Sequence, residues 1–407
     1  MMQLLYAFVF HYPLLMAFLL VGGSLVYHRL REREPDIEQL PSTPLVSILI
    51  PCHNEEEQIR DTITFLGRQE YPHFEIIAID DASTDRTPAI LRELEATNRR
   101  LRVVSLATNQ GKGMALTMGA VLARGEYLVC IDADALLDPR AVRYMLWHFL
   151  HFPRVGAVTG NPRVRNRTSI LGKIQVGEYS SIIGMIKRTQ RVIGKIFTVS
   201  GVVCAFRKRA LLSVGFWSND MYTEDIDVSW KLNLRFWDIR YEPRALCWIL
   251  MPETLRGLWR QRLRWARGGS EVLRKYLPMV LDWRQRRIWP TFIEYSISVV
   301  WAYAMAVTLC MYVLGRLVPL PPDLAVRHIV PGWTGVILSL VCLLQAAVGL
   351  SLDLRYDRGA LRLIFWLIWY PLIYWVLNAA VMIVGFPQAM LRKFGTPAVW
   401  EHPDRGV

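Results

Sequence analysis

The sequence has 407 residues, with 48 lysines and arginines against 35 aspartates and glutamates, and a formal net charge of +13. A chain of this length exceeds what one hydrophobic core usually serves, so we expect more than one structural unit. Four uncharged apolar stretches, each longer than the roughly 20 residues that span a bilayer, argue against a wholly soluble protein. They occupy residues 5–27, 295–315, 329–352 and 363–391.

The excess of positive charge lies near the predicted membrane boundaries and in stretches rich in arginine and tryptophan, such as residues 259–267. That placement favours anionic lipid and sugar diphosphate as partners and argues against nucleic acid. The six cysteines form no C-x-x-C pair and mostly lie within apolar runs, so we expect them to be reduced core residues.

The first apolar stretch has the flanks of a membrane anchor. No basic residue precedes it, whereas Arg29, Arg31 and Arg33 follow it, which argues against a cleaved signal peptide. Because positive charge marks the cytoplasmic side, we expect the amino terminus outside and the next domain in the cytoplasm. We therefore predict an anchor over residues 1–28, a cytosolic domain over 29–253, amphipathic interface helices over 254–291, about three transmembrane helices over 292–391 and a carboxyl-terminal tail over 392–407.

The loops between the later spans agree with this topology. The loop 353–362 carries three arginines and would be cytoplasmic, whereas the loop 318–328 carries one. Four spans would place the tail outside. The last stretch contains Pro371 and Pro387 and is long enough for one tilted helix or a broken one, so the side on which the tail lies stays open.

Short apolar runs alternate with longer amphipathic ones from residue 45 onward. The predicted strands are 45–50, 74–79, 102–106 and 127–131, and the predicted helices run to Gln69, through Leu94, over 112–123 and over 139–152. Such a series predicts an α/β fold with a mostly parallel, doubly wound, Rossmann-like sheet. Ligands of these sheets bind at the carboxyl ends of the strands.

Acidic residues follow the predicted strands at that edge. Asp81 follows the second strand, and Asp132 and Asp134 follow the fourth. Repelling carboxylates at one edge are costly unless a cation lies among them, and oxygen ligands suit magnesium or manganese on a diphosphate. A lone Asp-x-Asp arises by chance roughly once in a chain of this length, and turn aspartates that cap a helix, as expected for Asp85 and Asp138, are commoner still. The strand-end position of Asp132 and Asp134 favours function.

Two further strand ends carry candidate ligand contacts. Pro51 and Glu55 belong to the segment that follows the first predicted strand. The run from Asn109 to Gly113 follows the third strand and opens a helix, so its backbone amides and the ammonium of Lys112 suit an anion. A plain glycine turn explains that run equally well.

The region from residue 160 to 275 departs from the simple alternation. A strand is predicted over 197–206, and the run from Asp220 to Asp227 holds four acids in eight residues. A carboxylate here can take a proton from a hydroxyl group, and Asp225, with Glu224 beside it, is our candidate base. The run also has the pattern of a helix start, with Thr223 as the N-cap. In that interpretation the acids stabilise the helix, and Asp227 is the one we expect to have a structural role.

A basic, aromatic helix is predicted over residues 258–265. Its arginines and tryptophans form a face too basic for an ordinary core, and a helix on the membrane surface explains this equally well. Tryptophan rings also stack on sugars, and arginine pairs with phosphate oxygens.

Together these motifs resemble those of the processive family 2 glycosyltransferases, which include cellulose, chitin and hyaluronan synthases. The matching motifs are Asp80-Asp81, Asp132-Ala133-Asp134, Thr223-Glu224-Asp225 and Gln261-Arg262-Leu263-Arg264-Trp265. Each motif alone is weak, but the ordered set covers residues 40–280 inside an α/β pattern flanked by apolar stretches. Within the family, the chain is most similar to the bacterial synthases of the biofilm polysaccharide poly-β-1,6-N-acetyl-D-glucosamine, through residues 158–163, 173–179, 241–248 and 403–406. Those synthases are expected to have two spans before the domain, and here there is one.

The resemblance implies a GT-A-like glycosyltransferase domain on the cytoplasmic side of a bacterial inner membrane. It implies UDP-N-acetylglucosamine as donor and a growing polysaccharide chain as acceptor. The donor contacts would be Pro51, Glu55, Asp81, Lys112 and Asp132. A divalent metal, Mg²⁺ rather than Mn²⁺, would bind Asp132 and Asp134, and Asp225 and Glu224 would be catalytic. The diphosphate and the acceptor would contact Gln261, Arg264 and Trp265. A small membrane partner subunit and activation by cyclic di-GMP are also implied, although the sequence has no recognisable motif for that nucleotide.

The predicted reaction is a single displacement that inverts the configuration at the anomeric carbon from α to β. It is repeated at one site, and the product leaves between the spans. One rival is a sister enzyme that makes hyaluronan, chitin or cellulose, or that transfers one sugar to a lipid phosphate. A rival of another class is a membrane scaffold that binds a nucleotide without turnover. Product analysis separates the enzymes, and an Asp225→Asn substitution without effect would favour the scaffold.

Overall fold

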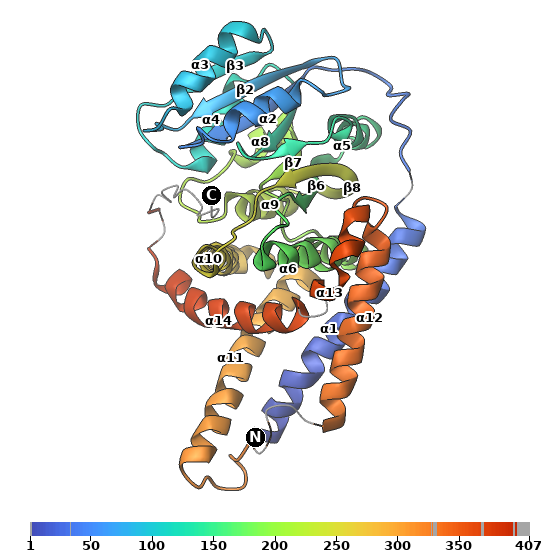
Figure 1. Ribbon diagram of the computed structural model, residues 1–407, viewed down its shortest axis with the longest axis vertical. Coiled ribbons are helices and arrows are strands. Elements are labelled where there is room, and N and C mark those ends of the chain that lie inside the picture. The colour runs from blue at the N-terminus through green and yellow to red at the C-terminus, as the bar shows by residue number, and fades with distance from the viewer. Residues whose placement is uncertain are drawn as a thin grey trace.

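The computed structural model describes residues 2–32, 34–326, 328, 332–367, 370–393 and 395–396. An α/β domain lies at one end, long helices extend away from the other, and a layer of helices lies between them (Figure 1). Arg33, residues 329–331 of the third predicted span and most of the predicted tail lie outside the described residues.

The α/β domain is organised around an eight-stranded mixed sheet with the order β3-β2-β1-β4-β7-β6-β8-β5. The strands are β1 (Val46–Cys52), β2 (Phe74–Asp80), β3 (Leu101–Ser105), β4 (Tyr127–Ile131), β5 (Leu136–Leu137), β6 (Val155–Val164), β7 (Val203–Arg207) and β8 (Asp238–Ile249). The pairs β1–β2, β1–β4, β2–β3 and β6–β8 are parallel, and the pairs β4–β7, β6–β7 and β5–β8 are antiparallel. The predicted mostly parallel, Rossmann-like sheet is confirmed.

Helices cover both faces of this sheet. One face packs against α2 (Ile59–Leu66), α3 (Thr87–Thr97) and α5 (Ala141–His151), and the other against α4 (Lys112–Leu122), α8 (Lys208–Val214) and α9 (Glu224–Leu234). Every residue of β1 is buried. A parallel strand between two helical layers has no solvent face, which explains why its sequence is a continuous apolar run rather than an alternating one.

The strand predicted over residues 197–206 is wrong over its first part. β7 begins at Val203, because Ser200 and Val203 form a bridge that turns the chain. The backbone N–H of Gly201 in this turn donates to Oδ2 of Asp225, at 3.2 Å. The strands β6 and β8 were not predicted, because Pro162 and Pro243 interrupt their alternation of apolar and polar residues.

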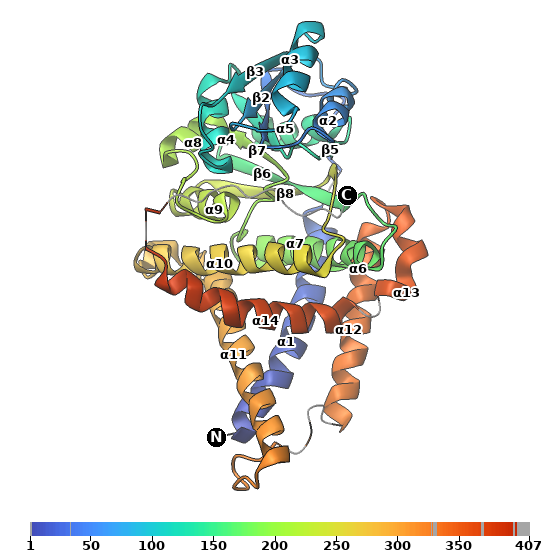
Figure 2. The same ribbon diagram turned by 60° about the vertical axis from the view of Figure 1, so that its left-hand side comes forward.

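A layer of helices separates the α/β domain from the long helices (Figure 2). It contains α6 (Ile170–Glu178), α7 (Gly184–Ile193), α10 (Leu255–Val280) and α14 (Tyr370–Leu391), with a π-helical turn (Tyr179–Ile183) between α6 and α7. Shorter elements are two 3-10 turns (Trp283–Gln285 and Arg358–Leu363) and α13 (Ile364–Leu367). The predicted amphipathic segment 254–291 thus corresponds mainly to α10.

Four helices are long and apolar enough to cross a membrane, namely α1 (Met2–Leu30), α11 (Trp289–Leu317), α12 (Gly332–Asp353) and α14. Figure 2 shows that α1, α11 and α12 extend away from the α/β domain, whereas α14 runs beside α10 and across α11. Just after α14, Arg392 donates to the Glu271 carboxylate at 2.7 Å and to the carbonyl of Asp220 at 2.8 Å. The end of α14 therefore lies against α10 and the loop before α9.

Four buried charged residues, which we call the anchor cluster, join the long helices to the α/β domain. They are Glu32 after α1, Arg163 on β6, Arg188 on α7 and Asp353 at the end of α12. Arg188 donates to Glu32 at 2.9 and 3.1 Å and to Asp353 at 3.0 Å, and Arg163 donates to Asp353 at 2.8 Å. Arg355, which is partly exposed, also donates to Glu32 at 2.6 Å. Each buried carboxylate of the cluster is therefore paired with guanidinium groups, as buried charges require.

Candidate active site

One cavity of about 1760 Å³ extends from the strand ends of the α/β domain to the apolar helices α1, α11, α12 and α14. Most residues predicted to form the site line it: Glu55, Lys112, Asp132, Asp134, Glu224, Asp225, Gln261, Arg264 and Trp265. Pro51 and Asp81 do not line it. The structure therefore brings the acids of the strand ends, the acids of α9 and the basic face of α10 to one space.

Lys112 connects the acids of two different elements. It is the first residue of α4, and its ammonium lies 2.6 Å from Asp132 Oδ1 and 3.3 Å from Glu224 Oε1. It also donates to the carbonyl of Gly201 at 3.2 Å. Burial by itself would lower the pKa of Lys112, but the carboxylates of Asp132 and Glu224 raise it above its ordinary value. The side chain therefore remains a cation at the acidic end of the cavity.

Asp225 lies in the first turn of α9 and faces the cavity. Gly201 N–H donates to Oδ2 at 3.2 Å, and Ile226 N–H donates to Oδ1 at 2.9 Å, so the carboxylate is oriented by two backbone groups. Burial and the adjacent charge of Glu224 raise the pKa of Asp225 to about 6. A carboxylate with a pKa near neutrality is a stronger base than an exposed one and still ionised at physiological pH.

Asp227, two residues further on, has a structural position. It is fully buried and accepts from Lys275 Nζ at 2.8 Å and from the Tyr276 hydroxyl at 2.7 Å, both on α10. The prediction that Asp227 is the structural acid of the run is confirmed. Thr223 lies at the cap position of α9 but makes no hydrogen bond to it through the side chain.

Asp81 holds the loop that precedes Lys112. Its two carboxylate oxygens accept from the backbone N–H groups of Gln110 and Gly111, each at 2.8 Å, and its side chain is fully buried. Gly111 has a φ of 87°, a conformation that favours glycine, as expected for a glycine turn. The predicted contact of Asp81 with the nucleotide-sugar donor stays a prediction.

Pro51 and Glu55 differ in position. Pro51 is a buried residue inside β1, in register with Ile79 of β2, so only the segment after it reaches the site. The side chain of Glu55 is buried in the cavity wall, and its backbone N–H donates to Thr87 Oγ1 at 2.7 Å. Glu55 therefore lies on the wall at the strand end, as predicted.

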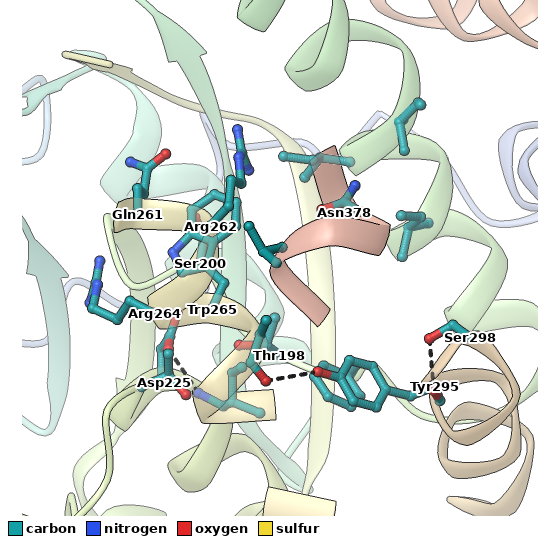
Figure 3. Close-up of a pocket in the computed structure, with 18 of the residues that line it drawn as sticks. Thr198, Ser200, Asp225, Gln261, Arg262, Arg264, Trp265, Tyr295, Ser298 and Asn378 are labelled. Atoms are coloured by element: carbon teal, nitrogen blue, oxygen red, sulfur yellow. Dashed lines mark hydrogen bonds between the residues drawn. The ribbon is translucent and has the colours of Figure 1, made fainter. Parts of the chain in front are cut away.

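Gln261, Arg264 and Trp265 project from α10 toward the cavity, close to Asp225 (Figure 3). Arg262, which was not singled out from the sequence, is buried and forms an ion pair with Glu178 of α6. Its guanidinium lies 4.2 Å from the centroid of the Trp265 ring. Arg262 thus packs on the Trp265 ring while Glu178 holds its guanidinium, a contact that only the tertiary structure reveals.

Two glycines of α10 were also missed from the sequence. A Cβ atom at Gly268 would overlap the side chain of Thr223 at the start of α9, and one at Gly269 would overlap the hydroxyl of Tyr295 on α11. The Gly-Gly pair within a helix was the available signal, because glycine is otherwise unfavourable there. Gly268 therefore lets α10 approach α9, the helix that carries Asp225, and Gly269 lets it approach α11.

Asp132 and Asp134 fit a metal that is shared with a substrate. Among the described residues, no group of three or more His, Cys, Asp or Glu side chains is placed to hold a metal ion. Magnesium and manganese sites of this kind use one or two carboxylates, and substrate phosphates and water supply the other ligands. Near Asp132, three carboxylates face the single ammonium of Lys112, which leaves a surplus of negative charge for a cation to balance.

Comparisons with known proteins agree with this arrangement. Residues 47–215 match the profile of glycosyl transferase family 2. The poly-beta-1,6-N-acetyl-D-glucosamine synthase of Staphylococcus epidermidis is 41% identical over 410 residues, which cover 99% of this chain and 98% of that protein. The synthase of the same name from Staphylococcus aureus (strain COL) is 40% identical over 405 residues, with 98% of both chains covered.

The fold is also similar to a solved structure. A mannosyltransferase from Pyrobaculum calidifontis, in complex with GDP-Man and Mn²⁺, matches 95% of this chain and 99% of its own, with a TM-score of 0.60 and 20% sequence identity. At this identity the likeness supports the fold alone. The matched region extends beyond the α/β domain, since it covers 95% of this chain.

Proposed function

The chain belongs to the poly-β-1,6-N-acetyl-D-glucosamine synthases of glycosyl transferase family 2, and from that premise we propose that it is a processive enzyme that polymerises N-acetylglucosamine from UDP-N-acetylglucosamine. The observation that carries this proposal is one continuous cavity with Asp225, Asp132 and Lys112 at one end and membrane-spanning candidates at the other. Hyaluronan, chitin and cellulose as products have less support, because the similarity to poly-N-acetylglucosamine synthases covers the whole chain.

Asp225 acts as the base in this proposal. It takes the proton from the acceptor hydroxyl as that oxygen forms a bond to the anomeric carbon of the donor and the bond to UDP breaks. The raised pKa and the two backbone hydrogen bonds support this role, because they supply basicity and orientation. Glu224 holds Lys112 in place, and the ammonium of Lys112 lies where it can neutralise charge on the diphosphate.

A divalent metal held by Asp132 and Asp134 would neutralise negative charge on the departing diphosphate. Magnesium rather than manganese stays a prediction, because both ions accept these oxygen ligands. Gln261 and Arg264 of α10 would bind the diphosphate or the acceptor, while the ring of Trp265, held by Arg262, would stack on the acceptor sugar. Asp81 would serve the donor through the loop that it holds.

The protein is a membrane protein, and we propose that its catalytic domain lies in the cytoplasm and that the product leaves between its spans. The crosswise position of α14 and the contacts of Arg392 favour three spans, α1, α11 and α12, with α14 in the plane of the interface. That arrangement places the tail on the side of the catalytic domain, which the odd number of spans requires. A reporter fused after residue 393 would be cytoplasmic under this topology and external under four spans.

The small membrane partner and the activation by cyclic di-GMP stay predictions from the resemblance. Each is tested by its addition to the purified enzyme. An increase in polymer synthesis on addition would support the factor in question.

The decisive test of the function uses membranes that contain the protein, magnesium and radiolabelled UDP-N-acetylglucosamine. We expect a polymer of high molecular mass that a β-1,6-hexosaminidase degrades. UDP-glucose and UDP-glucuronate serve as matched controls and should yield none. Polymer from either control, without polymer from UDP-N-acetylglucosamine, would move the chain to a sister activity, and transfer of a single sugar would contradict processivity.

A further inference from the structure

We propose that Lys187 of α7 is a positioning residue for the transfer reaction. It acts on the base, Asp225, through Thr159 of β6. Thr159 fixes the turn at Ser200 and Gly201, whose backbone orients the base. The proposal rests on the proposed function, since it takes Asp225 as the base. Lys187 belongs to none of the motifs found in the sequence. Ser200 and Asp225 both line the pocket (Figure 3).

The first observation is a chain of hydrogen bonds that runs from Lys187 to the base. The ammonium of Lys187 donates to Thr159 Oγ1 at 2.8 Å, and the backbone N–H of Ser200 donates to the same oxygen at 2.8 Å. The next backbone N–H, that of Gly201, donates to Oδ2 of Asp225 at 3.2 Å. One hydroxyl oxygen thus joins a side chain of α7 to the turn that orients the base.

The hydroxyl of Thr159 is fully engaged in this chain. A hydroxyl oxygen has two acceptor lone pairs and one proton. Lys187 and Ser200 use the two lone pairs, and the proton is directed to the carbonyl of Gly160, at 3.5 Å. Because Thr159 is fully buried, these partners set the position of its oxygen, and solvent does not. Removal of the ammonium would therefore loosen the hold on Ser200.

The second observation is that Lys187 is buried without an ion pair. The residue is 5% exposed, and its ammonium forms no ion pair with a residue that the structure describes. It lies 5.7 Å from the centroid of the Tyr241 ring. Burial lowers the pKa of Lys187 to about 8, so the side chain is still a cation at neutral pH. An unpaired buried charge costs stability, and a role in the site accounts for its presence here.

The third observation is the set of charges around the base. Glu224 of α9, Lys112 of α4, Arg264 of α10 and Lys187 of α7 all lie close enough to Asp225 to interact with its charge. Lys112 and Arg264 are also predicted substrate contacts, whereas Lys187 is not. Removal of Lys187 therefore changes the surroundings of the base and leaves the predicted donor contacts in place.

The first test is Lys187→Met, which keeps a side chain of similar length and removes both the charge and the hydrogen bond. We expect kcat to fall about ten- to hundredfold, because the base shifts relative to the acceptor hydroxyl. KM for the UDP-sugar should stay unchanged. The acidic limb of the pH profile of kcat/KM should move to higher pH, because loss of a nearby cation disfavours the ionised form of Asp225. A purely structural role for Lys187 would not move that limb.

Thr159 provides a second, independent pair of variants. Thr159→Val removes the hydroxyl and should lower kcat by a similar factor, whereas Thr159→Ser keeps the oxygen and should retain most of the activity. If Lys187 acts through Thr159, the two substitutions break one connection. The double variant Lys187→Met/Thr159→Val should then be no slower than the slower single variant.

Lys208→Met is the matched control. Lys208 of α8 donates to the carbonyl of Ala123 at 2.7 Å and lies outside the cavity lining, so its substitution removes a comparable hydrogen bond away from the site. Its kcat and its pH profile should be those of the wild-type protein. A loss of kcat in Lys208→Met as large as that in Lys187→Met would overturn the proposal, because it would show a general effect of removing a lysine.

A wild-type kcat and an unmoved acidic limb in Lys187→Met would overturn the positioning role and leave the proposed function intact. Full activity in Thr159→Val would overturn it as well, whether or not Lys187→Met folds. The assays use the UDP-sugar that the wild-type protein accepts, so a different donor leaves the test valid. If the wild-type protein transfers sugar from none of them, the proposed function itself fails, and the role of Lys187 fails with it.

Discussion

Two buried clusters of charge in this molecule are built in opposite ways. The anchor cluster pairs the carboxylates of Glu32 and Asp353 with the guanidinium groups of Arg163 and Arg188, and it is closed to solvent. The acidic end of the cavity places Lys112 among the three carboxylates of Asp132, Glu224 and Asp225, and it is open to the cavity. A cluster whose carboxylates are all paired with guanidinium groups stabilises the fold, whereas a cluster with surplus carboxylates keeps a charge that a substrate or cation can balance.

The largest effect is expected from a substitution at the acidic end of the cavity. Asp225→Asn removes the base and should reduce polymer synthesis by up to about 10⁴-fold, while the folded protein persists, because the amide oxygen can still accept from one of the two backbone N–H groups, that of Gly201 or that of Ile226. The initial rate of sugar incorporation measures the loss, and the temperature of heat-induced aggregation measures stability. A variant with substantial activity would contradict the role of Asp225.

The next largest effect is expected from a substitution in the anchor cluster. Arg188→Met leaves Glu32 and Asp353 buried with one partner fewer each, and should destabilise the protein by about 3–5 kcal/mol. Denaturation in detergent measures this. The matched control is Arg60→Met, which removes a surface ion pair with Glu93, and should leave the midpoint unchanged. Equal effects of the two substitutions would show that the anchor cluster is no stronger than a surface pair.

A smaller effect concerns the contact between α10 and the helix of the base. Gly268→Ala introduces a Cβ atom that overlaps Thr223, so it should destabilise the protein by about 1–3 kcal/mol and displace Asp225 from the acceptor. Reduced kcat and reduced heat stability should appear together. Gly22→Ala in α1 is the control, because no atom lies within 4 Å of the added Cβ. Full activity in Gly268→Ala would show that the two helices can separate without cost.

The smallest expected effect is a dependence of the activity on pH through Asp225. The pKa of Asp225 is raised to about 6 from the ordinary 3.8 of an aspartate, so the base becomes protonated as the pH falls below 6. Activity should therefore fall about tenfold per pH unit below 6 and reach a plateau above it. The pH profile of kcat/KM in UDP-N-acetylglucosamine, under conditions where the protein stays folded, measures the midpoint. A midpoint near 4 would show that burial and Glu224 do not perturb this carboxylate.

Elements that depend on local sequence patterns were predicted, whereas elements that depend on contacts between distant segments were not. The first four strands and their helices were predictable, because alternation of short apolar and amphipathic runs is a local property. β6 and β8 were not, because each strand is stabilised by partners far along the chain and contains a proline that breaks the pattern. The same distinction separates Arg264, a candidate contact predicted from the sequence, from Arg262, whose position is explained by its ion pair with Glu178 of α6.

The sequence by itself determined the fold class, the apolar helices and most of the candidate site, because residues that follow parallel strands must gather at one edge of the sheet. It also identified Asp225 and Asp227 as acids of different kinds. Only the tertiary structure decided that Asp81 holds the Lys112 loop, that α14 lies across α11, and that Lys187 is hydrogen-bonded to Thr159. These facts depend on contacts between segments distant in the chain, and a local pattern carries no information about which distant segment will be its neighbour.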